Sequence, residues 1–437
     1  MSRWLKRNKW MLLFWTGIFV FIVLLFRPWQ MMFDDNVSEP ASGGSGDLIR
    51  DYGELDPDVE NILAAGESLL GTPFLSGGRD PDEGFNSSGF VQYVYQESTG
   101  IRMPRIAAHQ HDLGEEIKKE DLYPGDLVFF EAETVMSGIY TGNGEFLTVS
   151  STNGVEKVSL ARDTFWSRHF IGGKRLTKEE MQGLHPGTYT EHSHPAVREA
   201  VQYLDTPYVF GGNTLNGFDC SFFIQDVFRE SSDIYLPRVT KDQYELGEEI
   251  DKKDLKPGDV LFFAGADGDE DDPRSDWDVN HTGIYAGGNF MIHASRTEGM
   301  TQVSYLNEYW DDAFTGIRRY DDMSLNHEHP VVQEAASHLF SEDFTTPGFV
   351  RHVYRKSLGI TLPQRAEDQW NSGSPVERDD LEIGDVLFFE GTNSYLAALY
   401  TGHDLAMFVS ASSGVTTRHL EYDEFFSENY LGARRYD

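Results

Sequence analysis

The octapeptide KPGDVLFF, residues 256–263, decides the fold because it occurs three times in variant form. The other copies are YPGDLVFF at residues 123–130 and EIGDVLFF at residues 382–389, so the separations are 133 and 126 residues. MPR, LPR or LPQ precedes each copy, and IGGKRL, TGIRRY or LGARRY follows it. Spacings this long exceed those of solenoid repeats and fit complete domains. The sequence therefore predicts three tandem domains, at residues 57–176, 195–320 and 330–437.

Each predicted domain starts with a helical pattern and continues with strand patterns. In the middle domain, Phe223, Ile224, Val227 and Phe228 recur at helical spacing, and both other domains have matching apolar residues. Helices packed on an antiparallel sheet would make each domain an α+β unit. The short apolar runs that indicate strands are Val260–Phe263, Thr282–Ala286, Phe290–Ala294 and Gln302–Leu306.

Composition excludes two broad classes of protein. A chain of 437 residues with 39% hydrophobic and 13% aromatic residues is too apolar for a disordered protein. The net charge of −36 argues against nucleic acid as a partner, because binding to phosphates requires basic surface.

The N-terminus predicts a membrane segment. An uninterrupted apolar run of seventeen residues spans Trp10 to Phe26, and basic residues precede it. We expect a cytoplasmic tip at residues 1–9, a transmembrane anchor at 10–29 and a flexible linker at 30–56, with all three domains outside the cell membrane. A cleaved signal peptide, cut near Ala41, is the alternative and would make the protein secreted.

Three reactive side chains occur together in the middle domain and are missing together from the other two. They are Cys220, which is the only cysteine, and the histidines His281 and His293. Their joint presence in one copy indicates function, whereas a lone buried cysteine or histidine is more often structural. The equivalent residues are Ser87, Met136 and Thr148 in the first domain and Thr346, Leu396 and Phe408 in the third.

This set of residues suits acyl transfer. The attacking species would be the thiolate of Cys220, favoured by the partial positive charge at a helix start. His281 would take the thiol proton, and His293 would orient that imidazole from an adjacent strand. A zinc site made of one cysteine and two histidines is the rival hypothesis, but structural zinc sites normally have four protein ligands. We expect neither a metal nor a cofactor.

The motifs PYVFGG, FDCS, LPR, KPGD, HTGIY and IHAS follow one another in the middle domain. In this order they resemble the NlpC-type cell-wall cysteine peptidases, which are papain-like enzymes, and the resemblance extends over all three domains. It implies a Cys220–His281–His293 triad that cuts amide bonds at the γ-carboxyl of D-glutamate. The polymer partner would be poly-γ-glutamate or peptidoglycan. A triple arrangement with one complete copy is similar to secreted poly-γ-glutamate hydrolases of this family.

The resemblance also implies that Tyr208, Asp219 and Ser221 line the substrate site. One departure concerns the nucleophile motif, which reads DCSF where the family has DCSG, so Phe222 replaces a glycine. A bulky side chain there is expected to push the nucleophile helix away from the sheet and to reduce or alter activity. The acidic run Asp267–Asp272 is interpreted as a solvated loop near the active site that repels polyanions at low salt.

Two alternatives remain open. The chain could be a non-catalytic, membrane-anchored scaffold that binds wall or polymer, because two domains lack the reactive residues. The histidines of the linkers His185–Pro195 and Asn326–Pro330 could bind a metal, although solvated linker residues are the more common case.

Overall fold

The computed structural model of the protein describes residues 52–266, 279–320, 329–392 and 394–436. The tip and the anchor predicted for residues 1–29 lie outside these ranges, and so do most of the predicted linker and the acidic run Asp267–Asp272. Within the described residues, no helix has the length and apolar character needed to cross a membrane.

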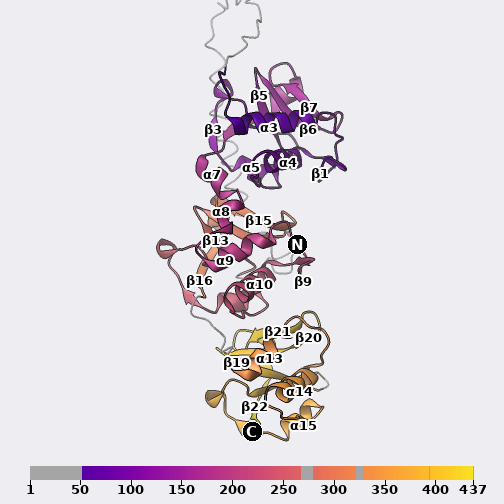
Figure 1. Ribbon diagram of the computed structural model, residues 1–437, viewed down its shortest axis with the longest axis vertical. Helices are drawn as coiled ribbons and strands as arrows, with labels where there is room; N and C mark the ends of the chain where they lie inside the picture. The colour runs from indigo at the N-terminus through magenta and orange to yellow at the C-terminus, as the bar shows by residue number, and fades with distance from the viewer. Residues whose placement is uncertain (1–51, 267–278, 321–328, 393, 437) are drawn as a thin grey trace, which may run out of the picture. The chain divides into compact units, whose positions relative to one another are not determined.

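Each domain consists of helices and a six-stranded antiparallel sheet, which confirms the predicted combination of helices and strands (Figure 1). The strand orders are β3-β8-β4-β5-β6-β7, β11-β16-β12-β13-β14-β15 and β17-β22-β18-β19-β20-β21. The topology is therefore the same three times. In each domain the longer second helix packs on the central strands, as α10 does on β13 and β14.

The elements of the three domains follow one another in a shared order. The first domain contains α3 (Pro57–Ser68), β1 (Arg79–Asp80), β2 (Gly84–Phe85), α4 (Ser87–Thr99), α5 (Ala107–His111), β3 (Glu115–Ile117), β4 (Leu127–Glu131), β5 (Val135–Gly142), β6 (Glu145–Ser150), β7 (Gly154–Ser159), α6 (Thr164–His169) and β8 (Phe170–Arg175). The middle domain contains α9 (Pro195–Ala200), β9 (Asn213–Thr214), β10 (Gly217–Phe218), α10 (Cys220–Ser232), α11 (Thr240–Tyr244), β11 (Glu248–Glu249), β12 (Val260–Phe263), β13 (His281–Gly287), β14 (Phe290–Ser295), β15 (Met300–Tyr305), α12 (Glu308–Ala313) and β16 (Phe314–Arg319). The third domain contains α13 (Pro330–Ala336), α14 (Thr346–Ser357), α15 (Ala366–Trp370), β17 (Ser374–Val376), β18 (Val386–Glu390), β19 (Tyr395–Gly402), β20 (Leu405–Ser410), β21 (Gly414–His419), α16 (Glu424–Asn429) and β22 (Tyr430–Arg435).

The predicted elements of the middle domain are confirmed with small shifts at their ends. Helix α10 buries Phe223, Ile224, Val227 and Phe228, the residues whose spacing predicted it. Strand β12 has the predicted bounds, and β13, β14 and β15 overlap the other three predicted strands. The edge strand β11 and its neighbour β16 were not predicted, because their polar residues give no alternating apolar pattern.

The connection between the first and middle domains, residues 177–194, is more structured than a solvated linker. It contains the short helices α7 (Lys178–Gly183) and, within the predicted linker, α8 (Gly187–Thr190), and it buries Leu184 and Tyr189. Its histidines serve local backbone groups: His194 Nδ1, for example, accepts a hydrogen bond from the first turn of α9 at 3.3 Å.

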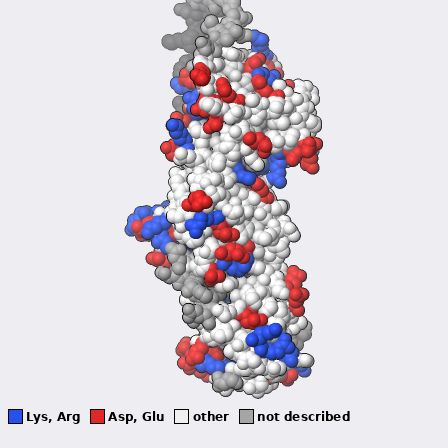
Figure 2. All heavy atoms as spheres, viewed as in Figure 1, with Lys and Arg blue, Asp and Glu red and all other residues white. Residues whose placement is uncertain are grey.

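Charged side chains of both signs are interspersed with uncharged surface on the face shown in Figure 2. The excess of 72 acidic over 36 basic residues therefore does not gather into one block on that face. Such a surface favours solubility and disfavours anionic partners at long range.

One ion pair explains two of the repeated sequence landmarks. Asp259, from the KPGD motif, accepts hydrogen bonds from Arg319 Nε at 2.7 Å and from Arg319 Nη2 at 2.8 Å. The same carboxylate accepts the backbone N–H of Lys256 at 2.8 Å. This bidentate ion pair joins the start of β12 to the end of β16. The matching pairs are Asp126 with Arg175 and Asp385 with Arg435.

We predict that Asp259→Asn lowers the free energy of unfolding of the middle domain by about 3 kcal/mol, because it breaks a buried, bidentate ion pair. The Asp259 side chain is 2% exposed. Urea-dependent hydrogen exchange of middle-domain peptides measures the change. Asp254→Asn is the control, since that side chain is 62% exposed and should change stability by less than about 0.5 kcal/mol. Equal stability of the two variants would contradict the prediction.

Candidate active site

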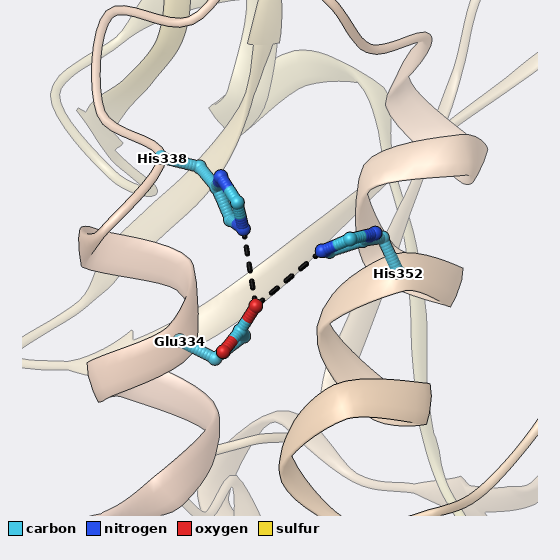
Figure 3. A group of neighbouring side chains, drawn as sticks. All are labelled: Glu334, His338 and His352. Atoms are coloured by element: carbon cyan, nitrogen blue, oxygen red, sulfur yellow. Dashed lines mark hydrogen bonds and ion pairs between the residues drawn. The ribbon is translucent and has the colours of Figure 1, made fainter.

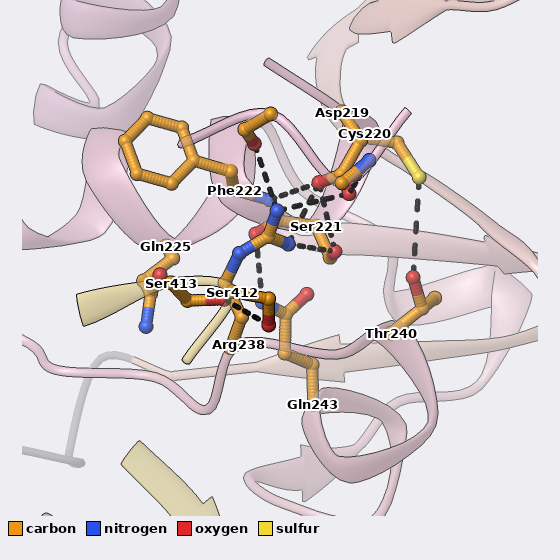
Figure 4. Close-up of polar contacts among 12 residues, drawn as sticks. Asp219, Cys220, Ser221, Phe222, Gln225, Arg238, Thr240, Gln243, Ser412 and Ser413 are labelled. Atoms are coloured by element: carbon orange, nitrogen blue, oxygen red, sulfur yellow. Dashed lines mark hydrogen bonds and ion pairs between the residues drawn. The ribbon is translucent and has the colours of Figure 1, made fainter. Parts of the chain in front are cut away.

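Cys220 is the first residue of α10, and Asp219 defines where that helix starts. The Asp219 carboxylate accepts a hydrogen bond from the N–H of the third helical residue at 2.9 Å, as an N-cap. The Cys220 sulfur lies 3.9 Å from Thr240 Oγ1 (Figure 4) and 3.9 Å from the backbone oxygen of Asn280, the residue before His281. The thiol is therefore buried at a helix start, beside the beginning of β13.

The two histidines meet because of strand register. His281 opens β13, and His293 lies on the adjacent β14, where Ile284 stands opposite Ile292. Continuing this register places Gly283 opposite His293, so His281 is the diagonal neighbour on the same face. Nε2 of His281 lies 2.8 Å from Nδ1 of His293. A Cβ atom at Gly283 would come within 3.0 Å of the Cβ of His293, so the glycine of HTGIY leaves room for this imidazole.

Two further side chains extend the hydrogen bonds from the histidines. His293 Nε2 lies 2.8 Å from Ser304 Oγ, and the Gln302 amide donates to the same oxygen at 2.9 Å. A hydrogen bond between two imidazole nitrogens needs one protonated nitrogen and one lone pair. When His281 keeps its Nδ1 as acceptor, its Nε2–H donates to His293, and His293 donates onward to Ser304. A single set of tautomers therefore satisfies all these contacts.

The indole of Trp310, on α12, packs against both imidazoles. Its ring centroid lies 5.5 Å from that of His281 and 5.2 Å from that of His293. Trp310 is itself buried and also packs against Phe263 at 4.8 Å. This aromatic cover limits the access of water to the histidine pair and restricts the ring orientations.

Asp219 and Ser221 belong to a buried network around Arg238 (Figure 4). The guanidinium donates to the two Asp219 carboxylate oxygens at 2.8 and 3.0 Å, to Ser221 Oγ at 2.9 Å and to the Gly212 carbonyl at 2.8 Å. Asp219 and Ser221 are 4% and 3% exposed. Their polar atoms thus serve this network, and their expected contact with substrate stays a prediction.

The first domain keeps the same network without a nucleophile. Arg105 Nη1 donates to Asn86 Oδ1 at 3.0 Å and to Ser88 Oγ at 3.2 Å, and its Nη2 donates to the Gly77 carbonyl at 2.6 Å. The arginine therefore supports the loop and the helix cap whether or not a thiol is present. In the third domain the three matching residues are Thr345, Pro347 and Gln364.

Tyr208, the third residue expected to line the substrate site, is half-buried. Its backbone N–H donates to the Gly299 carbonyl at 2.9 Å, and its backbone bridges to Phe218. The segment that carries the ring is therefore held on the domain, and contact of the ring with substrate stays a prediction.

Phe222 does not displace the nucleophile helix, contrary to expectation. Its ring is 2% exposed and packs against Phe218 at 5.7 Å and Phe340 at 4.9 Å, with the Arg238 guanidinium 5.7 Å away. Helix α10 still packs on β13 and β14. In the first domain the equivalent Gly89 has no such space, since a Cβ there would lie 2.1 Å from a backbone oxygen.

Sequence reasoning missed Ser304, Trp310 and the role of Arg238. Ser304 could not be found from the sequence alone, because only the strand pairing aligns it with Val158 and Arg418 and so shows that it is missing from the other two domains. Trp310 gave no signal, because the first domain has Trp166 at the same place. Arg238 stood in the repeated LPR motif, but its partners become visible only in the structure.

Comparison with known proteins identifies the family of the chain. The NlpC/P60 family model matches residues 71–175, 205–319 and 340–435. The gamma-DL-glutamyl hydrolase of Bacillus subtilis is 36% identical over 401 residues, which cover 87% of this chain and 92% of that protein. The probable endopeptidase NlpC of Escherichia coli is 41% identical over 114 residues, which cover 26% of this chain and 69% of that protein.

Solved structures are similar to single domains of this chain. The NlpC/p60 domain of the peptidoglycan hydrolase SagA is 27% identical and matches 27% of this chain and 98% of that one, with a TM-score of 0.25. Three family matches in one chain, together with a relative that aligns along most of its length, show that this protein belongs to the NlpC/P60 family.

Proposed function

We propose that this protein is an extracytoplasmic cysteine-type hydrolase that cuts γ-D-glutamyl amide bonds in poly-γ-glutamate or in peptidoglycan stem peptides. The observation that carries the proposal is the continuous hydrogen-bonded series from His281 through His293 to Ser304, in the one domain that has a cysteine. The similarity to a gamma-DL-glutamyl hydrolase supports the choice of bond.

On this proposal, each of these residues has a defined role in the reaction. His281 Nδ1 takes the proton of Cys220, and the thiolate attacks the amide carbonyl carbon. The negative oxygen that forms is stabilised by backbone N–H groups at the start of α10. The amine leaves with the proton from His281, and a thioester remains. Water then attacks the thioester, which releases the carboxylate product and restores the thiol.

His293 and Ser304 act by positioning. When His281 gains a proton it becomes an imidazolium, and its Nε2–H bond to His293 becomes charge-assisted and stronger. The bond from His293 to Ser304 holds His293 in the tautomer that can accept. These hydrogen bonds are therefore stronger when His281 is charged than when it is neutral. An interaction that strengthens as the reaction proceeds lowers the barrier, whereas one of constant strength only improves substrate binding.

The first and third domains retain cavities at the positions of the active site. In the first domain a cavity of about 1120 Å³ is lined by Ser87, Arg105 and Met136, the equivalents of Cys220, Arg238 and His281. A cavity of about 850 Å³ in the third domain is lined by Thr346 and other residues. We propose that these cavities hold segments of the polymer without cutting it. They are also the observation that favours the alternative, a non-catalytic polymer-binding scaffold.

The proposed location rests on the sequence. The apolar run from Trp10 to Phe26, preceded by basic residues, would anchor the chain in the cell membrane with its domains outside, next to wall or capsule polymers.

We predict that Cys220→Ala abolishes hydrolysis, with a loss on the order of 10⁴-fold, because no other side chain can form the thioester. Release of free amines from poly-γ-glutamate and from purified peptidoglycan is measured separately. Low and high salt are compared, since the net charge of −36 would repel a polyanion at low salt.

The outcomes of this assay separate the hypotheses. Release from one polymer that depends on Cys220 identifies the substrate class. Undiminished release by Cys220→Ala would refute the mechanism, provided that the variant melts at the wild-type temperature. Binding without any release by the wild type would favour the scaffold.

We predict that Ser304→Ala lowers kcat about tenfold and leaves KM nearly unchanged, because one hydrogen bond that orients His293 is lost. Steady-state hydrolysis of a short γ-glutamyl peptide measures both constants. Ser231→Ala, near the far end of α10, is the control and should match the wild type. An unchanged kcat for Ser304→Ala would show that Ser304 does not position the base.

We predict that Thr152→Trp, which fills part of the first-domain cavity, raises KM several-fold for the polymer but not for a short peptide. Thr152 is exposed, so the substitution should not disturb folding. Ser68→Trp is the control, because Ser68 is also exposed in this domain but does not line the cavity. Equal KM values for the two variants on the polymer would contradict polymer binding there.

A further inference from the structure

Three side chains of the third domain converge (Figure 3), and none of them is among the residues that line the cavity of that domain. Glu334 lies on α13, His338 follows four residues later, and His352 lies on α14. His338 Nε2 is 3.1 Å and His352 Nε2 is 3.4 Å from the same carboxylate oxygen, Oε1 of Glu334. Within the described ranges, this is the group of three metal-ligating side chains whose ligand atoms all lie within 4.8 Å of one another.

The fold does not require histidines at these positions. The positions of the two histidines can be matched to the middle domain by counting from the helix starts and by comparing backbone hydrogen bonds. His338 corresponds to Tyr203, and His352 corresponds to Asp226. Tyr203 donates to Asp226 there at 2.9 Å, and Asp226 also accepts from Arg229 Nε at 3.0 Å. At these two positions the helices therefore carry different side chains, although Glu199 stands where the third domain has Glu334, and the paired histidines need a separate explanation. The equivalent residues of the first domain are Leu69 and Tyr93.

The spacing of the ligand atoms fits a tetrahedral ion. Two atoms that each lie about 2.1 Å from zinc are about 3.4 Å apart at the tetrahedral angle. The two nitrogen–oxygen distances in the cluster, 3.1 and 3.4 Å, are close to this value. Without a metal ion, both imidazoles would have to donate hydrogen bonds to the same carboxylate oxygen, Oε1 of Glu334. The other oxygen of that carboxylate would then bond to neither imidazole.

The surroundings hold the ligands in place and keep them accessible. The ring of Phe344 packs against both imidazoles, with centroids 5.1 Å from His338 and 5.2 Å from His352. The three side chains are 23–28% exposed, so an ion can enter from solvent.

We propose that Glu334, His338 and His352 bind a divalent transition-metal ion, and that zinc is the ion that suits one carboxylate and two imidazoles. Water completes the coordination. Because the site has three protein ligands, where structural zinc sites normally have four, it is an open site, and the bound ion joins α13 to α14. This role is independent of hydrolysis, because the third domain lacks the reactive residues.

The test uses the full-length chain with Cys220→Ala, which removes the thiol as a competing ligand. After removal of metals with a chelator, the protein is titrated with zinc by calorimetry. We expect one equivalent to bind at the cluster, and Glu334→Gln and His352→Tyr to weaken that binding at least tenfold. Cobalt should give the visible absorption of a four-coordinate ion in the parent chain and not in the variants.

His403→Asn is the matched control. His403 is an exposed histidine of the same domain in a left-handed turn conformation (φ 50°), which asparagine also adopts. It should leave zinc binding unchanged. His352→Tyr copies the first domain, and Glu334→Gln is nearly isosteric, so at least one variant is expected to melt like the parent without metal. Zinc binding that is equal in the parent and both cluster variants, or no binding of zinc or cobalt by the parent, would overturn the proposal.

Discussion

The ion pair between Asp259 and Arg319 is the contact on which the active-site geometry depends. It ties the start of β12 to the end of β16 and so fixes the central strand within its sheet. Strand β12 then pairs with β13, with Phe263 opposite His281. A slip of one residue in this register would turn His281 to the other face of the sheet, away from Cys220 and His293. The proposed chemistry therefore depends on a strand register that a buried, bidentate ion pair helps to hold.

Local patterns predicted the elements of this fold, and the comparison of repeats within one chain predicted the candidate triad. Helix α10 and strands β12 to β15 follow from apolar spacing, which is set by residues near one another in sequence. Ser304 and Trp310 depend on which strands and helices lie side by side, so they emerged only with the sheet order. The family resemblance assigned Asp219 and Ser221 to the substrate site, but it could not reveal that Arg238 occupies their polar atoms.

The first domain has the same fold without the residues that carry the proposed chemistry. Thr148 takes the place of His293, and its hydroxyl donates to the backbone oxygen of Ser137 at 2.9 Å. Ser87 takes the place of Cys220, and its hydroxyl accepts the N–H of Ser137 at 3.4 Å. These buried polar groups are satisfied within the domain, so the substitutions leave little penalty behind. Arg105 meanwhile keeps its bonds to the helix cap, and so the scaffold does not need the nucleophile.

A protein of net charge −36 faces a physical difficulty if its substrate is a polyanion. Long-range repulsion opposes approach, but at physiological salt it is screened over about 8 Å. Short-range contacts then decide binding. The first-domain cavity is lined by Arg105 but also by three acidic residues, and the third-domain cavity is lined by Arg365 but also by two, so neither lining is cationic overall. A polymer segment held in either cavity would raise the local concentration of bonds available to the middle domain. On the proposed function, this gain accounts for two further copies of the fold beside the one domain that has the reactive residues.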